Sequence, residues 1–375
     1  MTTVHPAIRQ RRREPLSDAT LLMLIAIGIF LVMYASAVIL MGGAFQKPQQ
    51  FLDLFNENAA LIIIACSLTI VMIGGGINIS VGGIIGLTCM ACTKFLEYSA
   101  PQNSGLAVTL TVLLALAIGL AFGLFEGFMV SYLEIQPFIV TLAGMFLARG
   151  LTTILSVNPV KVTHEGFQTL VKTKLQIPWL GYVAKNGNLI SAKLEIGAII
   201  ALLVVVLVWL MLRYTQLGRG IYAVGGNRQS ALMLGINVRR TSFWSYVISG
   251  LLAGLAGLVF LMHKPAANAS IAMRSEMDAI AASIIGGTLL TGGVGNVFGT
   301  LFGVMILAAI QKIIGLSPLN ESWWQDMASG AMLGLFIMMQ SVVLSVREKA
   351  KGRKTDALDI SSGPGPSGQE VKTAV

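Results

Sequence analysis

Charged residues are scarce in this chain. Asp, Glu, Lys and Arg together make up 11% of its 375 residues, whereas a soluble domain averages about 25%. Hydrophobic residues make up 55%, and the mean hydropathy is +0.78. So few charges cannot cover a water-facing surface, which excludes an ordinary soluble protein. Lipid must be the main solvent, and we expect a polytopic membrane protein.

Cysteine and histidine are also rare, with three residues of each. Cys66, Cys89 and Cys92 all lie inside apolar segments. The C-x-x-C spacing of the last two lacks the wet, electropositive setting and the further ligands that redox or zinc chemistry needs. We therefore interpret the cysteines as small buried residues, and we expect no metal site.

Sequence motifs for catalysis are missing as well. The chain has no G-x-x-x-x-G-K-[ST] phosphate loop, no H-E-x-x-H and no G-x-S-x-G. Without the phosphate loop it cannot cradle ATP by itself in the usual way. We expect that the chain is not an enzyme and binds no cofactor.

Long apolar runs are abundant, and a membrane-spanning helix needs about 20 such residues. Two of the runs are weaker than the others and rich in small residues, Val81–Phe95 and Ala279–Leu290. The clear runs are Leu21–Met41, Ala59–Met72, Leu106–Val130, Phe138–Leu155, Ile196–Leu212, Phe243–Leu261, Val297–Ile314 and Ala328–Val346. We expect an all-α transmembrane helical bundle with about ten crossings.

The net charge of +9 comes largely from arginine clusters that flank apolar runs. This placement is typical of cytoplasmic loops and argues against a nucleic-acid surface. An even number of crossings puts both basic ends on one side, which we expect to be the cytoplasm. The predicted parts are a cytoplasmic N-terminus (1–19), a transmembrane domain (20–346) with a cytoplasmic loop at 213–242, and a disordered cytoplasmic tail (347–375).

Two glycine-rich stretches interrupt the apolar pattern: "GGGINISVGG" at Gly74–Gly83 and "IIGGTLLTGGVGN" at Ile284–Asn296. Irregular backbone is tolerated at membrane depth only where protein buries it or it faces a wet cavity. Paired interruptions indicate a transport pathway, although the first could equally be a tight surface turn. The polar candidates for lining or supporting a pathway are Asn78, Ser80, Glu126, Thr141 and Asn296.

Glycines also recur at four-residue steps, at Gly119, Gly123 and Gly127, and again at Gly295, Gly299 and Gly303. This spacing places glycines on one helix face and lets another backbone approach closely. Packing within the chain and a subunit interface are both consistent with the pattern.

A short polar segment, "GGNRQSALMLGINVRR", separates two long apolar runs. Asn227 is a good N-cap, and Gly235 can take the left-handed conformation that ends a helix. A helix of about two turns is not stable alone in water, so it must dock on something. It could lie against the membrane surface or dock on a partner. The candidate docking residues are Asn227, Arg228, Ala231, Leu232, Leu234 and Gly235.

These segments resemble a known family. "YAVGGNRQSALMLGINVRR" is similar to the cytoplasmic coupling segment of permeases in bacterial ABC importers for monosaccharides, the ribose/xylose/galactoside group. "GGGINISVGG", "IQPFIVTLAGMFLARGL" and "DAIAASIIGGTLLTGGVGNVFGTLFGV" resemble other motifs of that family. The galactofuranose permeases look like the closest branch. Asn78 stands where the family motif usually has Asp, and Glu126 stands where Asn is common.

The resemblance implies a division of labour. Two permease subunits, identical or sister chains, would form the pathway in the bacterial inner membrane. A separate ATPase would grip the Asn227–Gly235 helix, and a sugar-binding protein would deliver the monosaccharide to the outer face. The rivals are an ion- or proton-coupled carrier, for which Glu126 is the candidate ionisable group, and a non-transporting membrane scaffold.

Overall fold

The computed structural model describes residues 18–42, 45, 47–99, 105–183, 189–316, 323–324, 327–339 and 341–342. The predicted N-terminal segment (1–19) is described only at its last two residues. The predicted tail (347–375) lies outside the described residues.

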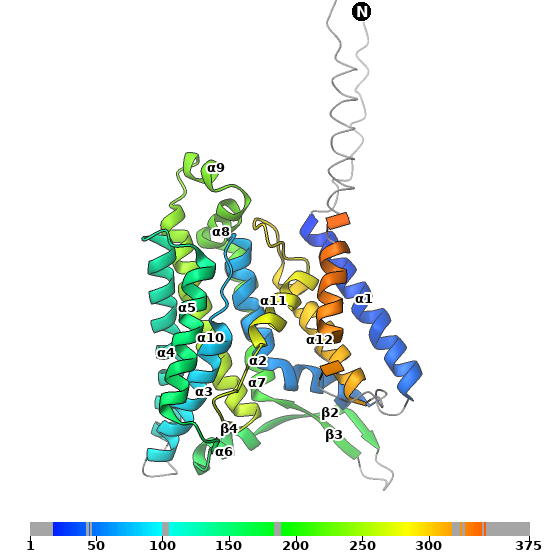
Figure 1. Ribbon diagram of the computed structural model, residues 1–375. Helices are drawn as coiled ribbons and strands as arrows, with labels where there is room; N and C mark the ends of the chain where they lie inside the picture. Colours follow the sequence, from blue (N-terminus) through cyan, green and yellow to red (C-terminus); the bar gives the residue numbers. More distant parts are fainter. Residues whose placement is uncertain are drawn as a thin grey trace, which may run out of the picture.

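Seven helices in the described part are long and apolar enough to cross a membrane. They lie side by side as a bundle (Figure 1). Each contains one of the long apolar runs of the sequence, and each is helical because the hydrocarbon core requires backbone hydrogen bonds within the segment. They are α1 (Asp18–Met41), α2 (Pro48–Ile73), α4 (Gly105–Ser131), α5 (Pro137–Leu155), α7 (Ile196–Tyr214), α10 (Val238–His263) and α12 (Val297–Leu316).

The two weak runs have a different structure from the others. α3 (Val81–Tyr98) begins only after the glycine turn that follows α2. α11 (Ser275–Ile285) has eleven residues, so at 1.5 Å per residue it is too short to span the hydrocarbon core. Glycines with positive φ at Gly287 and Gly292 break the helix beyond it. The expected total of about ten crossings is therefore not confirmed; a shorter apolar helix, Met327–Met339, accompanies the seven.

α2 and α10 form the core of the bundle, since more than two thirds of the most apolar stretch of each is buried. α10 packs along α4 with almost no side chain between them. A Cβ added at Gly119 or Gly123 would collide with the backbone of α10 at Gly250 or Val247. The first glycine ladder thus serves packing within the chain, the first of the two interpretations considered above.

The second ladder has the same role. A Cβ added at Gly299 would collide with the backbone of Gly286, and one added at Gly303 would collide with that of Ala282. α11 and α12 therefore lie in direct backbone contact. All three cysteines are buried and without disulfides, as their interpretation as small packed residues requires.

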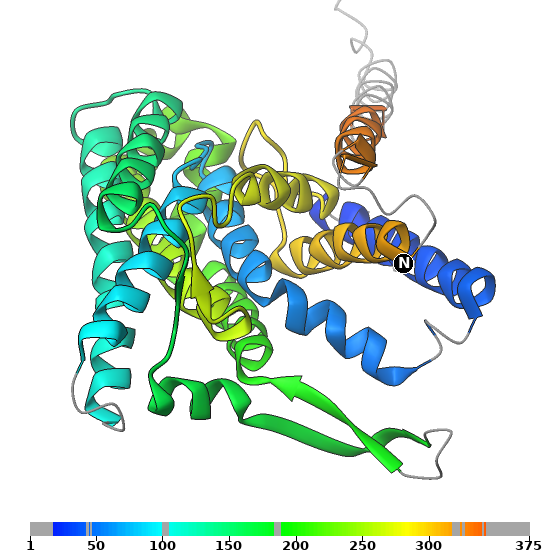
Figure 2. The ribbon, with the colours of Figure 1, turned by 60° about the horizontal axis from the view of Figure 1, so that its bottom comes forward.

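The two ends of the bundle carry different structures. At one end, β2 (Lys174–Val183) and β3 (Leu189–Glu195) form an antiparallel hairpin beside α6 (Glu165–Lys172). Figure 2 shows this hairpin projecting from the helices. At the same end β1 (Val160–Lys161) pairs with β4 (Ala266–Ala267). The apolar runs of the sequence leave this part of the chain unassigned, because the pattern around Pro178 does not mark a strand. We call this the hairpin end.

Candidate coupling and pathway sites

The opposite end carries α8 (Gln216–Gly226) and α9 (Arg228–Met233) (Figure 1). α9 is closed at both ends, as the sequence predicts. The Asn227 side chain accepts a hydrogen bond from the amide of Ser230 at 2.9 Å. Gly235 has φ +76°. The amides of Gly235 and Ile236 donate to the carbonyls of Leu232 and Ala231, both at 3.0 Å. This pair of hydrogen bonds is the Schellman motif, which satisfies the last carbonyls of a helix.

α9 has one buried side chain and an exposed apolar surface. Ala231 is 1% exposed and packs with Val224 and Val238 in a small separate core. Leu232, Met233 and Leu234 are exposed by 56%, 82% and 77%. We call these three residues the apolar knob. Ala231 anchors the helix to the bundle, so the knob is presented outward in a fixed position. Met233 was not among the residues predicted from the sequence.

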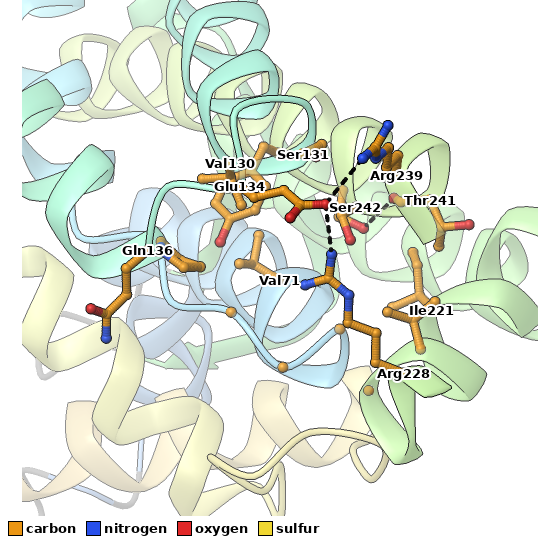
Figure 3. Close-up of a pocket in the computed structure, with 18 of the residues that line it drawn as sticks. Val71, Val130, Ser131, Glu134, Gln136, Ile221, Arg228, Arg239, Thr241 and Ser242 are labelled. Atoms are coloured by element: carbon orange, nitrogen blue, oxygen red, sulfur yellow. Dashed lines mark hydrogen bonds and ion pairs between the residues drawn. The ribbon is translucent and has the colours of Figure 1, made fainter. Parts of the chain in front are cut away.

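Glu134 lies beside the start of α9 (Figure 3). It occupies the turn between α4 and α5 with φ +54°, which is uncommon for a residue with a side chain. One oxygen of its carboxylate lies 3.7 Å from Arg228 Nη2 and 3.3 Å from Arg239 Nη2. All three side chains are more than half exposed, so each pair contributes at most about 1 kcal/mol. The two pairs connect the α4–α5 turn to the first residue of α9 and to the first turn of α10.

A cavity of about 540 Å³ opens next to these ion pairs. Its wall includes the glycine turn Gly74–Gly76, the α4–α5 turn with Gln136, and the start of α9. Figure 3 shows Glu134, Arg228 and Arg239 on one side of this space. The cavity reaches inward as far as Tyr246 on α10.

Three glycine segments meet behind α9, and we call this contact the glycine junction. The amide of Gly293 donates to the carbonyl of Ile73 at 2.8 Å. A Cβ added at Gly225 would collide with the same carbonyl, and one added at Gly292 would meet the backbone of Gly75. The ends of α2 and α8 and the glycine loop between α11 and α12 are thereby joined through backbone contacts. Both predicted interruptions of the apolar pattern thus lie directly against the segment that leads into α9.

A buried polar cluster lies deeper in the bundle, around the turn before α3. Asn78 donates from Nδ2 to Ser249 Oγ at 3.0 Å and accepts from Ser80 Oγ at 2.7 Å. Ser249 Oγ also lies 2.9 Å from Ser67 Oγ. All four residues are fully buried. The cluster ties α2, α3 and α10 together by hydrogen bonds, because buried polar groups need partners.

Glu126 and Thr141 border this cluster. Both are fully buried. Thr141 Oγ1 donates to the carbonyl of Pro137 at 3.0 Å. The Glu126 carboxyl group faces Ser80 and Asn78, yet neither of its oxygens forms a hydrogen bond within the described residues. A Cβ added at Gly144 would collide with it. Glycine at 144 therefore makes the space that Glu126 fills.

The structure brings four of the five pathway candidates together and leaves the fifth apart. Asn296 lies in the glycine loop after α11, where its Oδ1 accepts from the amide of Phe298 at 2.9 Å and caps α12. The four clustered residues are closed off from solvent in this conformation, so their part in a pathway remains a prediction. Ser67 and Ser249 were missed, although a serine inside an apolar run is a signal that the sequence carries.

A known protein family and several known proteins are similar to this chain over most of its length. The family described as "Branched-chain amino acid transport system / permease component" matches residues 50–338. The inner membrane ABC transporter permease protein YjfF of Escherichia coli is 38% identical over 339 residues, which cover 90% of this chain and 97% of the relative.

Two further relatives carry sugar names. The fructose import permease protein FruG of Bifidobacterium longum is 33% identical over 86% of this chain and 91% of its own. The ribose import permease protein RbsC of Bacillus subtilis is 31% identical over 84% of this chain and 92% of its own. No solved structure matches the chain.

Proposed function

Because the chain belongs to the family of permease components of ABC transporters, a membrane subunit family rather than an enzyme family, we propose that it carries a monosaccharide across the bacterial inner membrane in an ATP-driven importer. The family description names amino acids, whereas the relatives FruG and RbsC are named for fructose and ribose. A sugar is therefore the better supported substrate class. Galactofuranose joins the sugars to be tested, because of the motif resemblance noted above.

The observation that carries this proposal is the geometry of α9. A helix of six residues is too short to persist alone, yet here caps at both ends and the buried Ala231 hold it in place. It presents three apolar side chains to the outside. We propose that the apolar knob sits in a groove of a separate ATPase, with Asn227, Arg228 and Gly235 fixing the helix that carries it.

The glycine junction extends the same mechanism into the membrane. Closure of the ATPase would move α8 and α9 as one body, since Ala231, Val224 and Val238 pack together. Backbone contact at Gly225, Gly293 and Ile73 would pass this motion to α2 and α11. A rigid-body movement of this kind is a common way to switch access between the two sides of a membrane.

The remaining parts of the proposal concern partners and orientation. A second permease, a copy or a sister chain, would complete the pathway. α9 and both termini would be cytoplasmic, with about ten crossings in all. The hairpin end would then face outward, where a sugar-binding protein would dock. Membrane lipid would cover the exposed apolar faces of α4 and α5, on which Leu113 and Phe146 are more than half exposed.

Reconstitution tests this function. The permease, its ATPase and its binding protein are placed in liposomes, and uptake of radiolabelled ribose, xylose, galactose, fructose and galactofuranose is measured. We expect uptake of at least one sugar that requires ATP and is unchanged when ion gradients are collapsed. Uptake that follows a proton or sodium gradient and ignores ATP would establish the carrier instead. No uptake under any condition would favour the scaffold.

A further inference from the structure

A second cavity, of about 600 Å³, lies at the hairpin end of the bundle. Its walls come from the middle of α2, the start of α3, the last turn of α10, the first turn of α11 and the second half of α12. This volume lies within the range of about 300–1,000 Å³ that is typical of small-molecule sites. We call it the outer cavity. It is separate from the cavity beside α9, with which it shares no lining residue.

Several polar side chains in the outer cavity have unused hydrogen-bonding capacity. The Gln311 amide and the Ser275 hydroxyl form no side-chain hydrogen bond with any described residue. Asn58 donates from Nδ2 to the carbonyl of Leu54 at 3.0 Å, and its Oδ1 makes no bond within the described part. An amide offers both donors and acceptors, and a hydroxyl does the same. Together they suit a ligand that carries several hydroxyl groups.

The charges in the wall balance. Two acidic residues, Glu57 and Asp278, and two lysines, Lys264 and Lys312, line the cavity. Lys312 Nζ lies 3.3 Å from Glu57 Oε1. His263 also belongs to the wall, but its Nδ1 is engaged with Glu195 Oε2 at 2.8 Å. A wall without net charge favours neither an anion nor a metal ion, and it favours a neutral polar ligand.

Apolar groups complete the lining. Leu61 and Ile64 on α2, Ile85 on α3 and the ring of Phe260 on α10 contribute carbon surface. A monosaccharide has a rim of hydroxyl groups and faces made of C–H groups, so it needs both kinds of surface. The fold supplies both kinds of surface within one cavity, from five helices.

We propose that the outer cavity is a reception site for the monosaccharide, occupied after release from the binding protein and before entry into the pathway. The inference rests on the proposed function. Ile64 lies three residues before Ser67 on α2, and Ile85 lies five residues after Ser80 at the start of α3. The floor of the cavity is thus about one helical turn from the buried polar cluster, which is closed in this conformation. A sugar bound in the outer cavity would lie next to the closed polar cluster.

The test uses the complete reconstituted complex and two volume-preserving changes, Gln311→Met and Ser275→Ala, singly and together. Gln216→Met is the control, because Gln216 is exposed on α8 at the opposite end of the bundle, does not line the cavity and lies far from the proposed docking face of the binding protein. Two quantities are measured with the same radiolabelled sugars at saturating binding protein. One is the uptake rate, and the other is the ATPase rate that liganded binding protein stimulates.

We expect the double variant to lower sugar uptake about tenfold, the effect of losing two hydrogen bonds to the sugar. The stimulated ATPase rate should stay at the wild-type level, because the binding protein still docks. An equal fall in both rates would mean that the cavity is a docking surface for the binding protein, and would overturn the proposal. Unchanged uptake in the double variant would overturn it too. Wild-type complex that takes up no sugar would instead refute the proposed function itself.

Discussion

The side chains of Asn78 and Glu126 face each other where the turn before α3 packs against α4. In the resembling family an Asp is usual at the first position, and an Asn is common at the second. The acid and the amide have therefore changed places in this chain, while the buried pair keeps one of each.

This exchange predicts strong coupling between the two positions. Asn78→Asp alone puts two carboxyl groups against each other in a buried site, which should destabilise the protein by about 2 kcal/mol or more. Combining it with Glu126→Asn restores one acid and one amide. We expect the double variant to regain most of the thermal stability in detergent and most of the transport. Additive effects of the two changes would show that the residues do not interact.

The glycine junction predicts a sharp difference between two neighbouring glycines. A Cβ at Gly225 collides with the carbonyl of Ile73, whereas a Cβ at Gly226 meets no atom within 4 Å. Gly225→Ala should therefore separate α8 from α2, costing about 1–3 kcal/mol, and should lower ATP-driven uptake. Gly226→Ala is the matched control and should behave as wild type in both thermal unfolding and uptake assays. Equal behaviour of the two variants would rule out a tight contact here.

The apolar knob predicts where a single charge breaks the complex. Leu234 is 77% exposed, so Leu234→Asp should leave membrane insertion and yield unchanged. The charge would have to be buried against the ATPase, and we expect association to weaken at least tenfold in a pull-down. Gln216→Asp adds the same charge at an exposed position of α8 and should bind normally. Retention of the ATPase by the Leu234→Asp variant at wild-type yield would exclude α9 as the contact.

Backbone contact between α4 and α10 predicts the effect of one added methyl group. A Cβ at Gly250 would collide with the backbone of Gly119 and Gly123. Gly250→Ala should cost about 1–3 kcal/mol through overpacking and lower the melting temperature. Gly150→Ala, in α5 with no atom within 4 Å of the added Cβ, should be neutral or slightly stabilising. A melting temperature unchanged in the first variant would contradict the close approach.

Glu195 predicts how the hairpin responds to acid. Burial by itself would raise the pKa of Glu195, but hydrogen bonds from His263 and Lys174 outweigh burial and leave the pKa below its usual range. The distances are 2.8 Å to His263 Nδ1 and 2.9 Å to Lys174 Nζ. A carboxyl group with a lowered pKa stabilises the fold fully above its unfolded pKa of about 4.3, and this contribution is lost as pH falls through the folded value.

Hydrogen exchange of β2 and β3 in nanodiscs should therefore be constant between about pH 7 and pH 5 after correction for the intrinsic rate, and should accelerate below about pH 4. Glu195→Gln should remove this acid-dependent step. Glu165→Gln, which changes an exposed carboxylate at the same end, should keep it. Acid-induced exchange that survives in the Glu195→Gln variant would assign the effect to another group.

Local rules were enough to predict the caps of α9. Asn227 and Gly235 act through hydrogen bonds and backbone angles that involve only neighbouring residues, so the sequence states them directly. The same holds for the long apolar helices, whose length alone sets them apart. The number of crossings could not be predicted as safely, because glycine turns next to α3 and α11 interrupt the apolar pattern and α11 has only eleven residues.

Contacts between segments far apart in the sequence could not be predicted from local sequence patterns. Nothing near Glu134 in the sequence indicates that it meets Arg228 and Arg239, since the contact depends on how α4, α5 and α10 pack. The outer cavity could not be predicted from the sequence for the same reason. Asn58, Ser275 and Gln311 each look like ordinary polar residues beside apolar segments, and only the fold brings them together.

The dependence of α9 on its neighbours has a practical consequence for inhibitors. A synthetic peptide copying residues 227–235 would lack the packing of Ala231 against Val224 and Val238 and would be largely random coil. It would compete poorly for the ATPase groove despite carrying every side chain of the knob. A covalently stapled or cyclised version, held in the helical shape before binding, would spend less free energy on ordering and should be the far stronger competitor.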